Sequence, residues 1–161
     1  MQNILGIGFL ALILALPVNV QGEPCEAKLP DSSVYTGNCE SGLFNGKGKL
    51  VWRDGSIYEG DFKDGLMHGN GKFIHPAGWS GEGAFVNGTL TGKGVYRNEI
   101  GDIYEGDFKN SEFNGHGKYT TKSGDVCVGD YVNGKLHGKA KCEYTNGTVV
   151  VAVWEYGVLE N

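Results

Sequence analysis

The stretch YEGDFKDGLMHGNGKF, residues 58–73, returns as YEGDFKNSEFNGHGKY, residues 104–119. Three interpretations suit a motif so rich in glycine and histidine: a phosphate-binding loop, a metal site built on the His-Gly pairs, or a structural unit copied along the chain. A weaker copy that starts at Gly81 divides the interval between the two stretches into equal steps of 23 residues. A fixed step of this length is typical of stacked repeat proteins.

The same step aligns columns of glycine and of bulky side chains through most of the chain. It defines five full repeats, which start at residues 35, 58, 81, 104 and 127, and a half repeat over 150–161, so that the predicted repeat domain covers 35–161. The repeat positions that we expect to be structural include Tyr35, Tyr58, Gly60, Phe62, Gly69, Gly71, Phe85, Tyr104, Gly106, Phe108, Tyr131 and Trp154. Because glycine alternates with aromatic residues in these columns, the chain is not a disordered glycine-rich linker.

Within one copy, the side chains alternate with the period of two that marks a β-strand. Tyr58, Gly60 and Phe62 share one parity, and Glu59 has the other. A second alternating run over residues 69–73 follows a Lys-Asp-Gly turn, so each repeat predicts a β-hairpin. The whole chain therefore predicts an all-β fold, a single-layer antiparallel β-meander of 23-residue hairpins.

The glycines suggest a register for each hairpin, because aromatic rings can lie over bare glycine backbone. The pairs predicted on this face of repeat two are Tyr58–Phe73, Gly60–Gly71 and Phe62–Gly69. The opposite face supports the same register, because it brings opposite charges together. The pairs predicted there are Glu59–Lys72, Glu105–Lys118, Asp130–Lys139 and Asp107–His116.

Repeat three departs from the pattern at its first position. Gly81 stands where tyrosine is expected, and Trp79 lies two residues earlier with the same parity. The ring of Trp79 is therefore predicted to cover the vacancy.

The pattern Tyr-x-Gly-x-Phe, then His-Gly-x-Gly, as in YEGDFKDGLMHGNG from residue 58, resembles the MORN repeat (membrane occupation and recognition nexus) over residues 35 to about 157. The resemblance implies a twisted antiparallel sheet of hairpins that forms an elongated rod or groove, often pairs into dimers, and acts as a scaffold or attachment module. Some members have been linked to membranes or phosphoinositides. A net charge of −5 and the lack of a lysine-rich cluster disfavour binding of anionic lipid and of nucleic acid.

The first 22 residues are predicted to be a signal peptide. They carry no charged side chain, and their apolar run from Ile4 to Leu16 is shorter than a membrane span of ~20 residues. Pro17 ends the run, and Val20 and Gly22 suit cleavage after Gly22. The sequence thus predicts a secreted protein in which residues 23–34 form an N-terminal capping segment.

Four cysteines in a secreted chain suggest two disulfides, and spacing alone leaves three connectivities open. The register that sets Tyr58 against Phe73 also sets Cys127 against Cys142, which predicts a cross-strand disulfide there. Cys25 would then join Cys39 and fasten the capping segment over the open end of the sheet.

Two sequons, at Asn87 and Asn146, fall in predicted turns, where a glycan would be accessible. The alternative explanation is that Asn-Gly simply suits tight turns.

Catalytic, phosphate-binding and metal sites are not predicted. No helical periodicity follows the Gly-x-Gly runs, as phosphate binding would require, and three repeats separate His68 from His137, so these two cannot share a metal. No serine, cysteine or threonine has a recognisable base and orienting group. We therefore expect no enzyme activity and no cofactor.

The half repeat TVVVAVWEYG, which starts at Thr148, leaves an apolar edge strand. Natural edges are usually blunted by charge or proline, so residues 148–156 are predicted to pair with a second copy in a homodimer, unless the last residues fold over them. The predicted function is a secreted, non-enzymatic repeat module for protein–protein attachment or extracellular scaffolding. The alternative is a peripheral membrane module that binds phospholipid headgroups.

Overall fold

The structure, a computed structural model, describes residues 22–160. The predicted signal peptide, apart from Gly22, lies outside the described residues. The strands are β1 (Glu23–Lys28), β2 (Val34–Glu40), β3 (Leu43–Val51), β4 (Ile57–Lys63), β5 (Leu66–Ile74), β6 (Ser80–Val86), β7 (Thr89–Arg97), β8 (Ile103–Lys109), β9 (Glu112–Thr120), β10 (Val126–Val132), β11 (Lys135–Glu143), β12 (Val149–Glu155) and β13 (Val158–Leu159).

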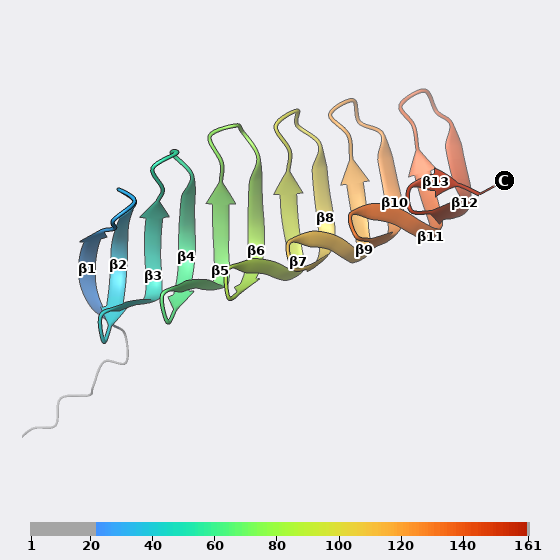
Figure 1. The fold of residues 1–161 in the computed structure, drawn as a ribbon. Coiled ribbons are helices and arrows are strands. Elements are labelled where there is room, and N and C mark those ends of the chain that lie inside the picture. Colours follow the sequence, from blue (N-terminus) through green and yellow to red (C-terminus); the bar gives the residue numbers. More distant parts are fainter. Residues whose placement is uncertain (1–21, 161) are drawn as a thin grey trace, which may run out of the picture.

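All thirteen strands form one open sheet in the order in which they occur along the chain (Figure 1). Every pair of neighbours is antiparallel, and no helix occurs in the part of the chain that the structure describes. The predicted single-layer meander is confirmed. The described residues accordingly include no helix that could cross a membrane.

Tight turns within the hairpins keep successive repeats in step. Asp64 and Gly65 both have positive φ, as do Asn87 and Gly88, which is the geometry of two-residue hairpin turns that match the twist of the strands. The second turn residue also reaches the preceding repeat, since the Gly88 N–H donates to the Met67 carbonyl at 2.9 Å. Equivalent bonds join Gly65 to Phe44, Ser111 to Leu90, Gly134 to Phe113 and Gly157 to Leu136.

The predicted register holds in only one half of each hairpin. In repeat two, the pairs Tyr58–Phe73, Glu59–Lys72 and Gly60–Gly71 are confirmed. Phe62, however, lies opposite Met67, so its predicted pairing with Gly69 is wrong.

The shift arises from a bulge at Gly69 and Asn70, which have no partner on β4. Gly69 adopts a φ of 59°, and the Asp61 carboxylate accepts the Asn70 N–H at 3.0 Å, which stabilises the bulge. On its other side, Gly69 pairs with Phe85 of the following repeat. The expected pairing of glycine with a bulky residue therefore joins neighbouring repeats.

Glu105 and Lys118 confirm one predicted charge pair, with Lys118 Nζ 2.6 Å from Glu105 Oε2. Glu59 lies opposite Lys72 as predicted, but the Lys72 ammonium group forms its ion pair with Glu82 on the next hairpin, at 3.4 Å.

The other two charge pairs need correction. Asp130 was expected opposite Lys139 but lies opposite His137 and His116, because the bulge shifts this half of the hairpin. Asp107 accepts the backbone N–H of His116 at 3.1 Å, whereas its ion pair is with Lys93 at 2.9 Å.

Both ends of the sheet differ from the central repeats. Cys127 is joined to Cys142 directly across β10 and β11, and Cys25 is joined to Cys39, with Cα–Cα distances of 4.1 and 5.8 Å. The register predicts the first pair, and the second is the pair expected between the two remaining cysteines. The segment expected as an N-terminal cap forms β1, the outermost strand beside β2. At the other end, β13 pairs with β12 only at its last two residues.

Candidate functional site

Repeats one, two and four share a ring that lies over two glycines. Tyr58 is fully buried, and a Cβ added to Gly71 would overlap its ring. Its hydroxyl donates to the Asp61 carbonyl at 3.0 Å, and Phe62 packs edge-on against it with 5.1 Å between ring centroids. Burial, helped by the negative charge of Asp61, raises the pKa of Tyr58 to about 12. Tyr35 and Tyr104 occupy equivalent positions and are also fully buried.

Repeat three lacks this ring, and its neighbours only partly replace it. A Cβ added to Gly81 would have a single neighbour within 4 Å, Leu90 Cδ2 at 3.7 Å. The ring of Phe108 approaches Gly94, at the position where Tyr58 covers Gly71 in repeat two. Leu90 and Phe108 thus lie against the glycine floor, and space remains above them.

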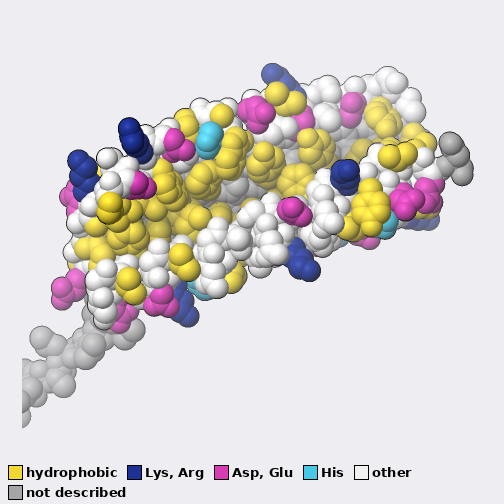
Figure 2. Space-filling view, in the orientation of Figure 1, with side chains coloured by type: hydrophobic (Ala, Val, Ile, Leu, Met, Phe, Trp, Pro, Cys, Tyr) yellow, Lys and Arg dark blue, Asp and Glu magenta, His cyan; other side chains and the backbone are white. Residues whose placement is uncertain are grey.

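The space is an apolar pocket of about 370 Å³. It is lined by Met67, Phe73, Trp79, Gly81, Phe85, Gly88, Leu90, Tyr96, Phe108 and Ser111. None of these side chains carries a charge at neutral pH, and the volume lies in the range of small-ligand sites. Figure 2 shows hydrophobic side chains in a band along the hollowed face of the sheet.

Trp79 lines this pocket and does not fill it. Its ring stacks on Phe73, at 5.0 Å and 25°, and on His75, at 4.8 Å and 10°. His75 is held in turn because its Nδ1 accepts the Ala77 N–H at 3.1 Å. The prediction that Trp79 covers the vacancy is therefore wrong: the ring forms a wall, and the pocket remains open.

A row of half-buried rings extends from the pocket toward the N-terminal repeats. Trp52 lies 5.5 Å from Phe73, and Trp79 lies 6.4 Å from Tyr96 on the other side. Trp and Tyr are the residue types most enriched at the energetic centres of protein interfaces.

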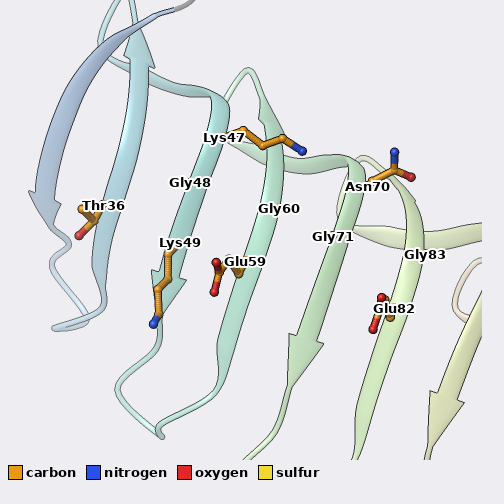
Figure 3. A pocket seen from close by; sticks show the side chains of 10 residues that line it. All are labelled: Thr36, Lys47, Gly48, Lys49, Glu59, Gly60, Asn70, Gly71, Glu82 and Gly83. Atoms are coloured by element: carbon orange, nitrogen blue, oxygen red, sulfur yellow. The ribbon is translucent and has the colours of Figure 1, made fainter.

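The opposite face is polar and carries a wider, shallow trough of about 800 Å³ (Figure 3). Its side chains come from β2 to β6 and stand over glycines 48, 60, 71 and 83. Lys47 Nζ lies 2.7 Å from Asp61 Oδ1, and Lys72 pairs with Glu82. Lys49 and Glu59 face each other across β3 and β4. Most charged side chains on this face therefore have a partner of opposite charge within the same face.

The other predicted site residues lie apart from one another. Asn87 is exposed in the turn between β6 and β7, next to Gly88 at the rim of the pocket. Asn146 is exposed in the loop before β12, and its Oδ1 accepts the Thr148 N–H at 2.9 Å. Trp154, at the end of the bulky column, is half-buried beside β13. Among residues 22–160, no three His, Cys, Asp or Glu side chains could hold a metal ion together.

Sequence reasoning missed Phe73, Leu90 and Tyr96 as lining residues. The available signal was a coincidence within one repeat: Gly81 in the tyrosine column, and Leu90 in a column that holds Phe44, Met67, Phe113 and Leu136 elsewhere. Repeat three alone combines a glycine and a leucine at these two positions, which indicates a local loss of ring volume.

Comparison with known proteins gives one clear result. The chain is weakly similar to a solved structure described as the SAS-4 (dCPAP) TCP domain in complex with a Proline Rich Motif of Ana2 (dSTIL) of Drosophila Melanogaster. The two chains are 10% identical, the match covers 96% of this chain and 99% of that chain, and the TM-score is 0.37. No curated protein sequence matches this chain. The MORN-repeat family model matches residues 35–57, 58–80, 82–103, 104–126 and 127–149. The chain therefore belongs to the MORN-repeat family.

Proposed function

We propose that this protein is a secreted, non-enzymatic attachment module that binds a protein partner through its aromatic face. MORN repeats are generally non-catalytic modules that bind proteins or membranes. The observation that carries the proposal is the contrast between the two faces. The charged side chains of the polar face form ion pairs with one another. The aromatic face contains an open pocket lined by rings, including those of Trp79 and Tyr96.

The composition of the aromatic face favours a protein over a lipid headgroup. The core of a protein interface is depleted in charge and enriched in aromatic residues, as this pocket is. Anionic headgroups are bound by clusters of lysine and arginine, and the pocket lining contains neither.

Secretion is supported by two independent features. The N-terminal apolar run has the length of a signal peptide, and both cysteine pairs lie at disulfide distance, which suits an oxidising compartment.

The test compares capture of extracellular proteins by the immobilised, oxidised chain and by two variants. Trp79→Ala with Tyr96→Ala removes ring surface from the aromatic face, while Glu105→Gln with Lys118→Gln is the matched change on the polar face. We expect the first variant to lose the captured partner roughly tenfold or more, since central aromatic residues dominate interface energies, and the second to retain it. Equal capture by both variants, or capture of anionic phospholipid vesicles in place of a protein, would contradict the proposal.

We also propose that two copies pair through β12. In the described chain, β13 covers only Trp154 and Glu155, and the Glu160 N–H bonds to the Val153 carbonyl, which leaves the outer edge over residues 149–152 unpaired. Val149 and Val151 are more than half exposed, at 54% and 57%. The edge of β1, by contrast, carries Pro24 and charged residues that discourage pairing.

Light scattering tests this pairing at increasing protein concentration. We expect a dimer that Val151→Lys converts to a monomer, because like charges would face each other near the two-fold axis. A monomer at high concentration, unchanged by the substitution, rules out the homodimer.

The exposed Asn87 and Asn146 are proposed glycosylation sites, with occupancy of at least one. A mass unchanged by glycosidase, for protein from a eukaryotic secreting cell, would exclude both.

A further inference from the structure

We propose that the pocket of repeat three receives one aromatic side chain, tyrosine or phenylalanine, from the partner protein. The inference rests on the proposed function and adds to it the chemical class of the residue that the aromatic face recognises.

The other repeats supply the template for this occupant. The first position of a repeat holds a buried tyrosine in repeats one, two and four and a disulfide in repeat five. Repeat three keeps the two glycines, Gly83 and Gly94, that elsewhere form the floor beneath the ring. In repeat three, Leu90 and the Phe108 ring lie against these glycines, and the space that remains above them, beside Gly81, is the pocket.

The walls of the pocket favour an aromatic ring over other side chains. Phe73, Trp79, Tyr96 and Phe85 present rings to the space, and ring pairs contribute more than their buried area alone. Apolar cavities in proteins bind ring-shaped apolar molecules readily. A charged side chain would lose its hydration with no counter-ion in the pocket lining.

The topology favours recognition of a side chain over addition of a strand. β6 is paired with β5 on one side and with β7 on the other, so its backbone groups are already bonded. A partner at this site can gain little from backbone hydrogen bonds. It must insert a side chain.

The direct test uses blocked amino acids as probes, with amide NMR of the full mature, oxidised protein as the readout. N-acetyl-L-tyrosinamide and N-acetyl-L-phenylalaninamide should shift the Gly81, Leu90 and Ser111 resonances, whereas the leucine and lysine analogues should shift them roughly tenfold less at equal concentration. The absence of shifts up to the solubility limit, or equal shifts with the lysine analogue, would overturn the inference.

The decisive variant fills the pocket from within. Gly81→Tyr combined with Leu90→Met copies the residues of repeat two, Tyr58 and Met67, onto repeat three. We expect it to fold with the wild-type amide pattern outside the pocket and to lose the probe response. Leu136→Met, the same change in the same column of repeat five, is the control and should respond as wild type. A persistent response in the filled variant would refute the site.

Capture experiments separate this inference from the proposed function. If the filled variant captures the partner as well as wild type while Trp79→Ala with Tyr96→Ala does not, the aromatic face binds but the anchor is wrong. If neither change affects capture, the proposed function itself fails. Loss of capture in both variants, with Leu136→Met unaffected, supports the anchor.

Discussion

Repeats three and four share one hairpin register and have different interiors. In both, a pair of glycines faces across the hairpin, Gly83–Gly94 and Gly106–Gly117, and the register shifts directly after it. In repeat four, Tyr104 is fully buried and stacks on Phe113 with 3.8 Å between ring centroids. In repeat three, the two corresponding positions are occupied by Gly81 and Leu90.

The difference shows that the buried ring does not set the register. Repeat three keeps the bulge and the two-residue turn although it lacks the ring, so these backbone features are sufficient to align the strands. The ring contributes packing energy, and its absence in one repeat opens a cavity on an otherwise regular surface.

Tyr104→Ala should have the largest effect on stability. It removes a fully buried ring and the hydroxyl that donates to the Asp107 carbonyl at 3.0 Å, so we expect a loss of about 3–5 kcal/mol in the free energy of unfolding. Tyr96→Ala in the wall of the repeat-three pocket should cost only about 1 kcal/mol, because this ring is half-exposed. Denaturant unfolding of the oxidised protein measures both; equal losses would mean that the two repeats are packed alike.

Alanine substitutions of two glycines should have a smaller but clearly asymmetric effect. A Cβ on Gly117 would overlap the Tyr104 ring, so Gly117→Ala should cost about 1–3 kcal/mol. Gly81→Ala has room and should be neutral or slightly stabilising. Neither glycine has a positive φ, so backbone strain does not confuse the comparison. A stability loss at Gly81 as large as at Gly117 would show that the pocket is closed in solution.

Alkaline pH should lower the stability of the protein by ionising the buried tyrosines of the other repeats. Repeat three has no such group at its first position, because Gly81 replaces the tyrosine. Burial raises the pKa of Tyr58 and of Tyr131 to about 12, from an ordinary value of 10. The folded state then holds these protons more tightly than the unfolded state. Stability is therefore unaffected below pH 10 and falls as the pH rises toward 12.

Unfolding midpoints at pH 9, 10 and 11, with tyrosinate absorbance as a second readout, test this pH dependence. Tyr58→Phe should flatten the decline. A decline of wild-type steepness in that variant would assign the effect to other groups.

The smallest effect is expected on the polar face. Repeat four pairs Glu105 with Lys118, whereas repeat three sets Glu82 opposite Val95. Val95→Lys copies repeat four and should add about 0.2–0.5 kcal/mol at low salt, because exposed pairs are weak and screened. Unfolding at low and high salt measures it; a gain that persists in high salt would point to packing by the lysine stem in place of charge.

Local pattern was sufficient to predict the strands, the meander and half of each hairpin register. The pairing of Cys127 with Cys142 followed from the same register and needed no information beyond counting. The prediction that Phe62 pairs with Gly69 was wrong because one and the same sequence can pair through an uninterrupted ladder or through a bulged one. Only the positive φ of Gly69 and the bond from the Asn70 N–H to Asp61 distinguish them.

The pocket could not be predicted because volume depends on how neighbours relax. The sequence showed a missing tyrosine at Gly81, and Trp79 had the correct parity to replace it. Trp79 instead stacks on Phe73 and His75 and forms a wall of the pocket, while Leu90 and Phe108 approach the glycines. Which ring fills a gap is decided by competing contacts that no single strand contains.

By itself, the amino-acid sequence determined the repeat length, the alternation of faces, the family and the pairing of Cys127 with Cys142, because each depends on period and parity along the sheet. The tertiary structure alone decided the bulge in each hairpin, the ion pairs that cross to the next repeat, and the open pocket of repeat three. Those features depend on contacts between side chains of three or more neighbouring strands, where packing and hydrogen bonding choose among arrangements that the sequence pattern leaves equally good.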